Sequence, residues 1–111
     1  SDCLFCRIVA GEIPSNAVHE TNGTYAFADI DPKAPTHVLV IPKRHIDHFH
    51  ALSDPGLTAE LVQSAQAVAE KEGIVETGYR VVANVGADGG MAVSHLHFHI
   101  LGGRALGWPP G

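Results

Sequence analysis

Positive charge, cysteine and long apolar runs are all scarce in this chain. Lys and Arg number 7 against 12 for Asp and Glu, and the net charge of -5 argues against general nucleic-acid binding. No apolar run approaches the roughly 20 residues that span a bilayer, and the chain does not open with a signal-like hydrophobic core. We therefore expect a cytoplasmic protein with neither a membrane nor a nucleic acid as partner.

Internal repeats, low-complexity segments and linkers are also absent. At 111 residues and 11.7 kDa, the chain fits a single domain, residues 1–111, whose modest core a partner subunit would help to stabilise. The 45% hydrophobic and 17% charged contents are those of an ordinary globular protein. Neither a disordered nor a fibrous chain is indicated.

Short strand patterns flank one clear helical pattern. Apolar residues recur at helical spacing from Leu57 to Glu72, directly after the start signal Asp54-Pro55. A shorter helix is expected within residues 4–14. The segments expected to form strands are 17–20, 25–30, 36–43, 79–85 and 95–101. This order predicts an α+β fold with an antiparallel sheet, one main helix and a short N-terminal helix.

Three histidines alternate with apolar residues in the last of these strands, "HLHFHIL". In a strand, His95, His97 and His99 share one face, about 7 Å apart, while the apolar residues between them face the core. Three readings are open: a polar sheet face, a metal site completed from elsewhere, or catalysis on a phosphate. The glycine-rich loop 86–90 before the strand favours the third reading, because backbone N–H groups bind anions and imidazole provides a nucleophile or an acid–base pair.

The only cysteines, Cys3 and Cys6, form a C-x-x-C pair at the start of the chain. In a reducing compartment a metal or redox role is favoured over a structural disulfide. A redox pair usually follows a strand in a βαβ pattern, which is missing here. A structural zinc needs two further ligands, and two buried free thiols are the remaining alternative.

The sequence resembles the histidine triad superfamily over essentially its whole length. "HLHFHIL" matches the signature His-φ-His-φ-His-φ-φ, where φ is apolar. "FADIDPKAPTHVLVIPKRHI", "NVGADGG" and "LGGRALGWPPG" resemble the Hint branch, the purine nucleoside phosphoramidases. The resemblance implies a homodimer whose two sheets join into one, one nucleotide site in each subunit and no catalytic metal.

By the same resemblance, His97 is the nucleophile that attacks the α-phosphorus of a nucleoside phosphoramidate. A nucleotidyl-histidine forms, and water then releases the nucleoside monophosphate. His99 would hydrogen-bond the phosphate, His37 would join the proton network, and the carbonyl of His95 would orient the His97 ring.

The resemblance also assigns the nucleotide contacts. Asp29 would bind the ribose hydroxyls, although it could equally be a turn residue, and Trp108 would contact the leaving group or anchor a dimer. The phosphate would be held by Asn84 and the backbone N–H groups of residues 89–92, and the nucleotide contacts in this loop would be Gly90, Met91, Ala92 and Val93. The base pocket would be walled by Leu4, Phe5, Ile8, Ile13, Phe27 and Ile30, for which plain core packing is an equal alternative.

Two features qualify the resemblance. Where Hint proteins usually carry Gln-Ser, this chain has Met91-Ala92 and so lacks a hydroxyl. One charged hydrogen bond is worth roughly 1.5 to 3 kcal/mol, so turnover would be about ten- to a hundredfold slower. Some histidine triad proteins also hold a structural zinc, which here maps onto Cys3, Cys6, His45 and His95.

Three functions follow as hypotheses. The first is a purine nucleoside phosphoramidase. The second is a nucleotide-binding scaffold, in which Ala92 marks lost chemistry, but pure binding does not need a nucleophile. The third is a dinucleotide hydrolase or nucleotidyl transferase, whose branches usually carry glutamine where this chain has Phe98. The histidines at 48 and 50 receive no role.

Overall fold

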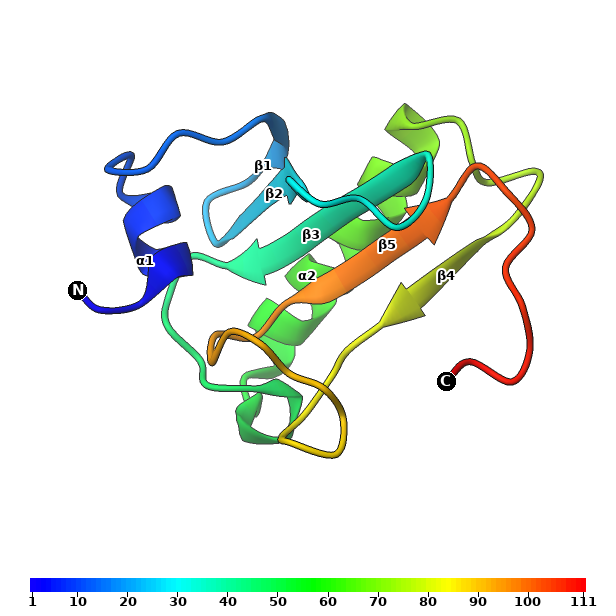
Figure 1. Cartoon of the computed structure of the whole chain (residues 1–111). Helices are drawn as coiled ribbons and strands as arrows, with labels where there is room; N and C mark the ends of the chain where they lie inside the picture. The colour runs from blue at the N-terminus through cyan, green and yellow to red at the C-terminus, as the bar shows by residue number, and fades with distance from the viewer.

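The computed structural model describes all 111 residues as one five-stranded sheet with two helices (Figure 1). In chain order the elements are α1 (Leu4–Val9), β1 (Ala17–Glu20), β2 (Thr24–Ala28), β3 (Thr36–Pro42), a 3-10 turn (Phe49–Ala51), α2 (Pro55–Lys71), β4 (Tyr79–Val82) and β5 (Phe98–Gly102). The strand order is β1-β2-β3-β5-β4, and every neighbouring pair is antiparallel. The predicted α+β fold is confirmed. None of the helices has the length and apolar character needed to cross a membrane.

Helix α2 begins where the sequence signals predict. The Asp54 carboxylate accepts hydrogen bonds from the N–H groups of Gly56 and Leu57, which otherwise have no partner in the first turn. The side chains that α2 buries recur at helical spacing: Leu61, Ser64, Ala65, Val68 and Ala69. Each fully buried Leu or Val contributes about 1.5–3 kcal/mol, so Leu61→Ala alone would cost about 2–5 kcal/mol.

Strand β3 is buried along its whole length because both of its faces are covered. Val38 and Val40 belong to the core cluster under α2, whereas Leu39 and Ile41 belong to a second cluster that includes residues of α1. In Figure 1, α2 lies behind the sheet and α1 lies beside β3. Beyond β3, the sheet face away from α2 is only partly covered, and the histidines lie on this face.

Strand β5 begins three residues later than predicted, at Phe98 rather than at His95. The β3–β5 register would place Leu96 opposite Pro42, which has no N–H to donate to the ladder. The Pro42 carbonyl instead accepts a hydrogen bond from the His95 ring, and the Leu96 N–H donates to the Ile46 carbonyl at 2.7 Å. Side-chain and loop bonds thus replace the ladder at this end.

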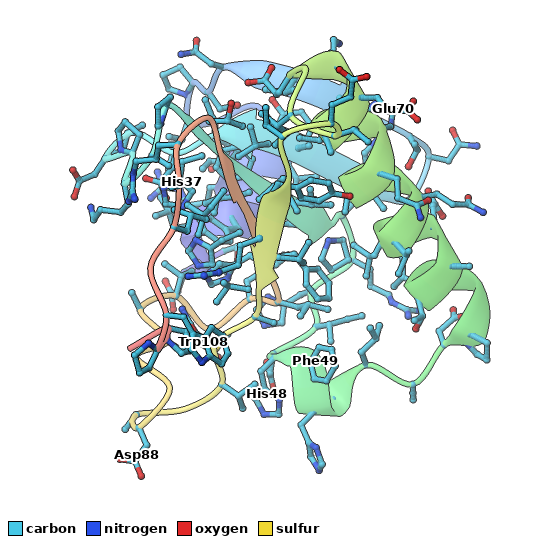
Figure 2. All side chains as sticks on the ribbon, turned by 90° about the vertical axis from the view of Figure 1, so that its right-hand side faces the viewer. His37, His48, Phe49, Glu70, Asp88 and Trp108 are labelled. Atoms are coloured by element: carbon cyan, nitrogen blue, oxygen red, sulfur yellow. The ribbon has the colours of Figure 1, made fainter.

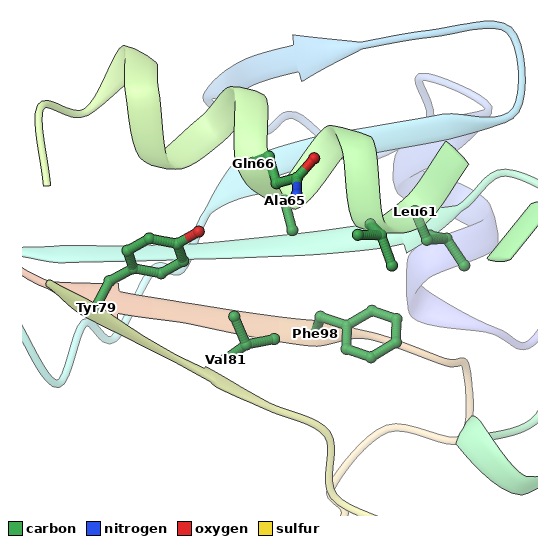
Figure 3. Close-up of a pocket in the computed structure, with 7 residues that line it drawn as sticks. Leu61, Ala65, Gln66, Tyr79, Val81 and Phe98 are labelled. Atoms are coloured by element: carbon green, nitrogen blue, oxygen red, sulfur yellow. The ribbon is translucent and has the colours of Figure 1, made fainter. Parts of the chain in front are cut away.

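An apolar hollow of about 190 Å³ lies between α2 and the edge of the sheet (Figure 3). Its lining residues come from α2, β4 and β5: Leu61, Val62, Ala65, Gln66, Tyr79, Val81 and Phe98. Val62 and Val81 are about half exposed, and β4 pairs with β5 alone. This edge of the molecule combines unpaired backbone groups with exposed apolar side chains.

Candidate active site

The histidine triad lies on the sheet face away from α2, as its alternate spacing predicts. Leu96 and Ile100 point into the core cluster under α2. The rings of His97 and His99 lie on the other side, with their centroids 5.0 Å apart. The alternation persists although His95 and His97 precede the regular strand.

His97 presents one defined nitrogen to the site. Its Nδ1 lies 2.7 Å from the backbone carbonyl of His95. A carbonyl only accepts, so Nδ1 carries the hydrogen and Nε2 keeps a free lone pair. The Phe5 ring meets the imidazole edge-on with centroids 5.2 Å apart, and the residue is only 6% exposed. The ring is therefore held in one tautomer and one orientation.

A second chain of hydrogen bonds fixes the tautomers of His37 and His99. The Lys33 backbone N–H donates to Nδ1 of His37 at 3.0 Å, so Nε2 of His37 carries the hydrogen. That Nε2–H lies 2.9 Å from Nδ1 of His99 and donates to it. The remaining hydrogen of His99 is on Nε2, which is buried and has no partner in the protein. This N–H is a free donor for a bound ligand.

Burial keeps these two rings neutral. It lowers the pKa of His99 to about 4, and the neighbouring His97 and His37 act in the same direction. Burial likewise lowers the pKa of His37, although the Asp29 carboxylate opposes the shift. At pH 7 both rings therefore act as neutral donors and acceptors rather than as cations.

Asp29 makes a turn and also lies next to the triad. Its Oδ1 accepts a hydrogen bond from the Asp31 N–H at 2.9 Å, which makes a turn after β2. Its Oδ2 lies 3.4 Å from Nε2 of His37, which puts the carboxylate next to the triad. The residue predicted to bind the ribose therefore lies beside the histidines.

A cavity of about 540 Å³ brings together part of the predicted phosphate site, although His97 does not line it. Asn84 and Gly89 line it with His37 and His99. Gly89 must be glycine, because a Cβ atom there would lie 2.4 Å from the Val85 carbonyl oxygen.

Part of the predicted backbone cradle is already occupied. The Gly90 N–H donates to Ala87 and the Met91 N–H donates to Gly86. The Ala92 and Val93 amides donate to no protein group, so they remain available to a phosphate. The free donors are therefore Ala92, the last residue of the segment expected to bind phosphate, and Val93 directly after it.

The residues predicted to wall the base pocket divide into two groups. Phe5, Ile8 and Phe27 form part of one buried cluster, and Ile13 and Val93 pack against it. The other two are on the surface: Leu4 is 44% exposed and Ile30 is 99% exposed. Buried members pack as core residues do, whereas the exposed pair would become covered only by a ligand or a partner.

Trp108 is 80% exposed and lies near the Arg80 guanidinium, 6.0 Å from its ring centroid. Figure 2 shows Trp108 and His37 on the side of the sheet opposite α2. The sequence analysis missed Arg80, which lines the cavity that holds His37 and His99. Its place in a predicted strand, two residues before Val82, was the available signal, but the register that aims it at the cavity is not visible in the sequence.

The four predicted zinc ligands converge at the other end of the triad. The Cys3 sulfur lies 3.3 Å from Nδ1 of His95, and the Cys6 sulfur lies 3.4 Å from Nδ1 of His45. All four ligand atoms lie within 4.8 Å of one another. A tetrahedral Zn²⁺ with ordinary bond lengths separates sulfur from nitrogen by about 3.6 Å, so the donor set fits this metal.

Hydrogen bonds prepare both histidines of this candidate metal site as ligands. His95 donates its Nε2–H to the Pro42 carbonyl at 2.8 Å, and His45 donates its Nε2–H to the Asp47 carboxylate at 2.9 Å. In each ring Nδ1 therefore keeps the lone pair that faces the sulfurs. Burial lowers the pKa of His95, which also favours the neutral form that binds metals.

Comparisons with known proteins agree with this architecture. A family model described as HIT domain matches residues 10–106. The crystal structure of a HIT family hydrolase from Legionella pneumophila Philadelphia 1 is 48% identical, with a TM-score of 0.95 over 99% of this chain and 100% of that one. The histidine triad nucleotide-binding protein from Candida albicans is 34% identical, with a TM-score of 0.85 over 97% of this chain and 83% of that one.

The name of one plant relative refers to zinc binding. The 14 kDa zinc-binding protein of Zea mays is 42% identical over 124 residues, covering 100% of this chain and 89% of the maize protein. The family model spans most of the chain, and these relatives match it almost from end to end. With the triad histidines on one sheet face and a Cys/His cluster beside them, the chain belongs to the HIT domain family.

Proposed function

We propose that the protein hydrolyses the P–N bond of purine nucleoside 5′-phosphoramidates through a nucleotidyl-histidine. The observation that carries the proposal is the bond from Nδ1 of His97 to the His95 carbonyl, which leaves the lone pair of Nε2 free to act as the nucleophile. The relatives named as a hydrolase and as a nucleotide-binding protein support the same class of ligand and reaction. No metal takes part in this scheme.

In the first step, Nε2 of His97 attacks the α-phosphorus and the P–N bond breaks. The departing amine takes a proton from water, because Ala92 has no hydroxyl to supply one. The ring then carries a positive charge, which the His95 carbonyl stabilises through Nδ1–H. The free Nε2–H of His99 would donate to a phosphate oxygen that gains charge in the transition state.

In the second step, a water molecule attacks phosphorus and breaks the P–N bond to His97. The water loses one proton to solvent, the nucleoside monophosphate leaves and the neutral ring is restored. The balance is one water consumed for one amine and one nucleotide released. The nucleoside would lie toward β2, where Asp29 and the Phe27 cluster stand beside the histidines.

We further propose that Cys3, Cys6, His45 and His95 hold a structural zinc. Bound there, the metal would cross-link the N-terminal helix to the end of β3 and to the triad strand, and it would supply no chemistry at phosphorus. The sulfur–nitrogen distances and the two hydrogen-bonded rings support this assignment. The name of the maize relative supports it as well.

The homodimer expected from the resemblance also belongs to this proposal. Strand β4 has one free edge, and the adjacent apolar hollow is lined by Val62 and Val81, both about half exposed (Figure 3). A second copy pairing along β4 would cover both features. Light scattering coupled to size-exclusion chromatography distinguishes a species of twice 11.7 kDa from a monomer.

A scaffold role and a dinucleotide-cleaving role are weaker candidates. A scaffold would not need the tautomer of His97 to be fixed. The position where dinucleotide-cleaving branches carry glutamine is Phe98, which packs against the core under α2.

The deciding experiment is steady-state hydrolysis of a fluorogenic adenosine 5′-phosphoramidate by the wild type, His97→Ala and Ala92→Ser. We expect His97→Ala to lose turnover and Ala92→Ser to gain it about tenfold or more, because a hydroxyl is restored beside the phosphate. If the wild type binds a nucleoside monophosphate tightly but hydrolyses nothing, the scaffold role replaces the enzyme.

A further inference from the structure

The Arg104 guanidinium binds two backbone carbonyls and no carboxylate. Its Nη2 donates to the Lys33 carbonyl at 2.8 Å, and its Nη1 donates to the Ala105 carbonyl at 3.0 Å. No Asp or Glu carboxylate lies within 4.0 Å of it. The side chain therefore joins two segments that are 71 positions apart, the chain after β5 and the connection between β2 and β3.

Lys33 lies in a connection that has little hydrogen bonding of its own. Residues 30–35, between β2 and β3, take part in no backbone–backbone hydrogen bond. The Lys33 ammonium bonds Asp31, which belongs to the same connection. Outside the connection, the groups that bond Lys33 are the His37 ring and the Arg104 guanidinium. Arg104 is thus the main group that holds the Lys33 backbone in place against His37.

The turn after β5 passes close to this connection. Gly102 of β5 pairs with Thr36 of β3, so the chain leaves β5 beside the end of the connection (Figure 1). Gly103 has a φ of +90°, and a Cβ atom on it would lie 2.8 Å from Cβ of Pro35. Glycine is therefore required at this position. The close approach brings the next side chain, that of Arg104, within reach of the connection.

The Lys33 N–H sets the direction of the hydrogen bond between His37 and His99. While it donates to Nδ1 of His37, Nε2 of His37 carries the hydrogen, and Nε2–H of His99 is the free donor. Without it, the hydrogen of His37 can move to Nδ1 and the bond to His99 reverses, so Nε2 of His99 presents a lone pair that repels a phosphate oxygen. The Asp29 carboxylate, 3.4 Å from Nε2 of His37, also favours the first arrangement, but at more than ordinary hydrogen-bond length. We therefore expect a partial reversal when the Lys33 N–H is displaced.

We infer that Arg104 is a positioning residue for the triad: by holding the Lys33 carbonyl it keeps the Lys33 N–H on His37, and it thereby keeps His99 a donor toward phosphate. Arg104 does not line the cavity that holds these histidines, so it acts through Lys33. A guanidinium suits this task because it stays charged and presents its donors in a fixed plane. The effect on catalysis rests on the proposed function, whereas the tautomers of His37 and His99 can be measured without it.

The test uses Arg104→Met, which removes the donors and keeps an apolar stem. Long-range ¹H–¹⁵N spectra of protein with ¹⁵N-labelled histidine distinguish protonated from unprotonated ring nitrogens, and His37→Gln and His99→Gln assign the two rings. At pH 7 the wild type should show Nε2–H in both rings, and Arg104→Met should show a mixture of tautomers in both. Arg104→Lys, which retains one charged donor, should lie between them. The matched control is Arg44→Met, because Arg44 is exposed and pairs with Asp54 instead; its spectrum should match the wild type.

Turnover of a fluorogenic adenosine 5′-phosphoramidate is the second readout. Arg104→Met should lower kcat about tenfold and change KM less than twofold, because the donor that is partly lost faces an oxygen that gains charge in the transition state. Arg44→Met should leave both constants unchanged.

Unchanged ring tautomers in Arg104→Met would overturn the inference even if the melting temperature fell, since that is the result of a purely structural role. Altered tautomers with wild-type kcat would overturn it as well. If the wild type hydrolyses no phosphoramidate, the proposed function is wrong, and calorimetric titration with adenosine monophosphate replaces kcat. Binding about tenfold weaker in Arg104→Met would then support the positioning role, and equal binding would refute it. If Arg104→Met does not fold, Arg104→Lys is judged by the same criteria.

Discussion

Two clusters that contain histidines lie at opposite ends of the triad segment, residues 95–99. Their rings turn different nitrogens toward the group that each cluster would bind. At the metal end, formed by Cys3, Cys6, His45 and His95, both rings donate Nε2–H and turn Nδ1 toward sulfur. At the phosphate end, formed by His37, His97 and His99, the His97 ring donates Nδ1–H and keeps Nε2 free. Each tautomer is set by an acceptor or a donor that the fold supplies. The chemical role of a histidine in this protein therefore depends on which ring nitrogen its hydrogen-bond partner leaves free.

The largest expected effect is on kcat, and it comes from substituting His97 rather than His95, which is two residues away. His97→Gln should lower kcat for a nucleoside phosphoramidate by at least about a thousandfold, because the nucleophile is lost. Its melting temperature should stay close to that of the wild type, since no metal ligand changes. His50→Ala, at an exposed site with no assigned role, is the control. Activity above a tenth of the wild-type value would place the nucleophile elsewhere.

Cys6→Ser, at the metal end, should lower the melting temperature, which His97→Gln leaves close to the wild-type value. We expect zinc content, measured by atomic absorption, to fall from about one per chain to near zero. The melting temperature should fall by about 10 °C or more, because the cross-link between the N-terminal helix and the sheet is lost. Cys3→Ser should behave alike. Full zinc occupancy in either variant would contradict the proposed ligand set.

The pH dependence of the free energy of unfolding should reveal the lowered pKa of His99 at the phosphate end. Its pKa is about 4 in the folded protein, below the ordinary value of about 6.5 in the unfolded chain. Between these values the unfolded state binds the extra proton, so the free energy of unfolding falls as the pH drops from 6.5 to 4. The loss due to this ring amounts to at most about 3 kcal/mol.

Urea unfolding at several pH values measures this effect. In His99→Gln the decline over the same pH window should be shallower, and the difference between the two curves cancels any loss of metal common to both. Identical slopes for the two proteins would show that the His99 ring titrates normally.

The smallest expected effect concerns Asp47, which contacts a proposed zinc ligand, His45, and would not contact the metal itself. Asp47 accepts the Nε2–H of His45, so Asp47→Ala should weaken zinc binding by about tenfold without abolishing it. Competition with a chromophoric chelator measures the change. Asp47→Asn, which retains an acceptor oxygen, should recover much of the affinity. An unchanged affinity in Asp47→Ala would show that this carboxylate leaves the ligand ring unaffected.

Some of this arrangement could be predicted from the sequence because it depends on local periodicity. Alternation alone placed His97 and His99 on one face and Leu96 in the core, and the capping signal at Asp54 placed the start of α2. The start of β5 was predicted wrongly, because the constraint comes from Pro42, which is distant in sequence and adjacent in space.

Contacts between distant segments could not be worked out from spacing. Cys3 and His95 are separated by 92 positions, and only the family resemblance paired them. The Lys33 N–H that fixes the tautomer of His37 gives no signal at all, because any residue except proline has one. Arg80 was missed for a related reason, since strand register alone aims it at the cavity.

The position of Phe5 links the two ends of the molecule. It lies between the two cysteines in α1, and its ring contacts both His95, at a centroid distance of 5.8 Å, and His97, at 5.2 Å. A chelator that strips zinc would release α1 and with it the packing that holds the nucleophile. Chelator sensitivity is the usual criterion for a metalloenzyme, and with the proposed zinc this protein would meet it although the proposed mechanism has no metal contact with the substrate.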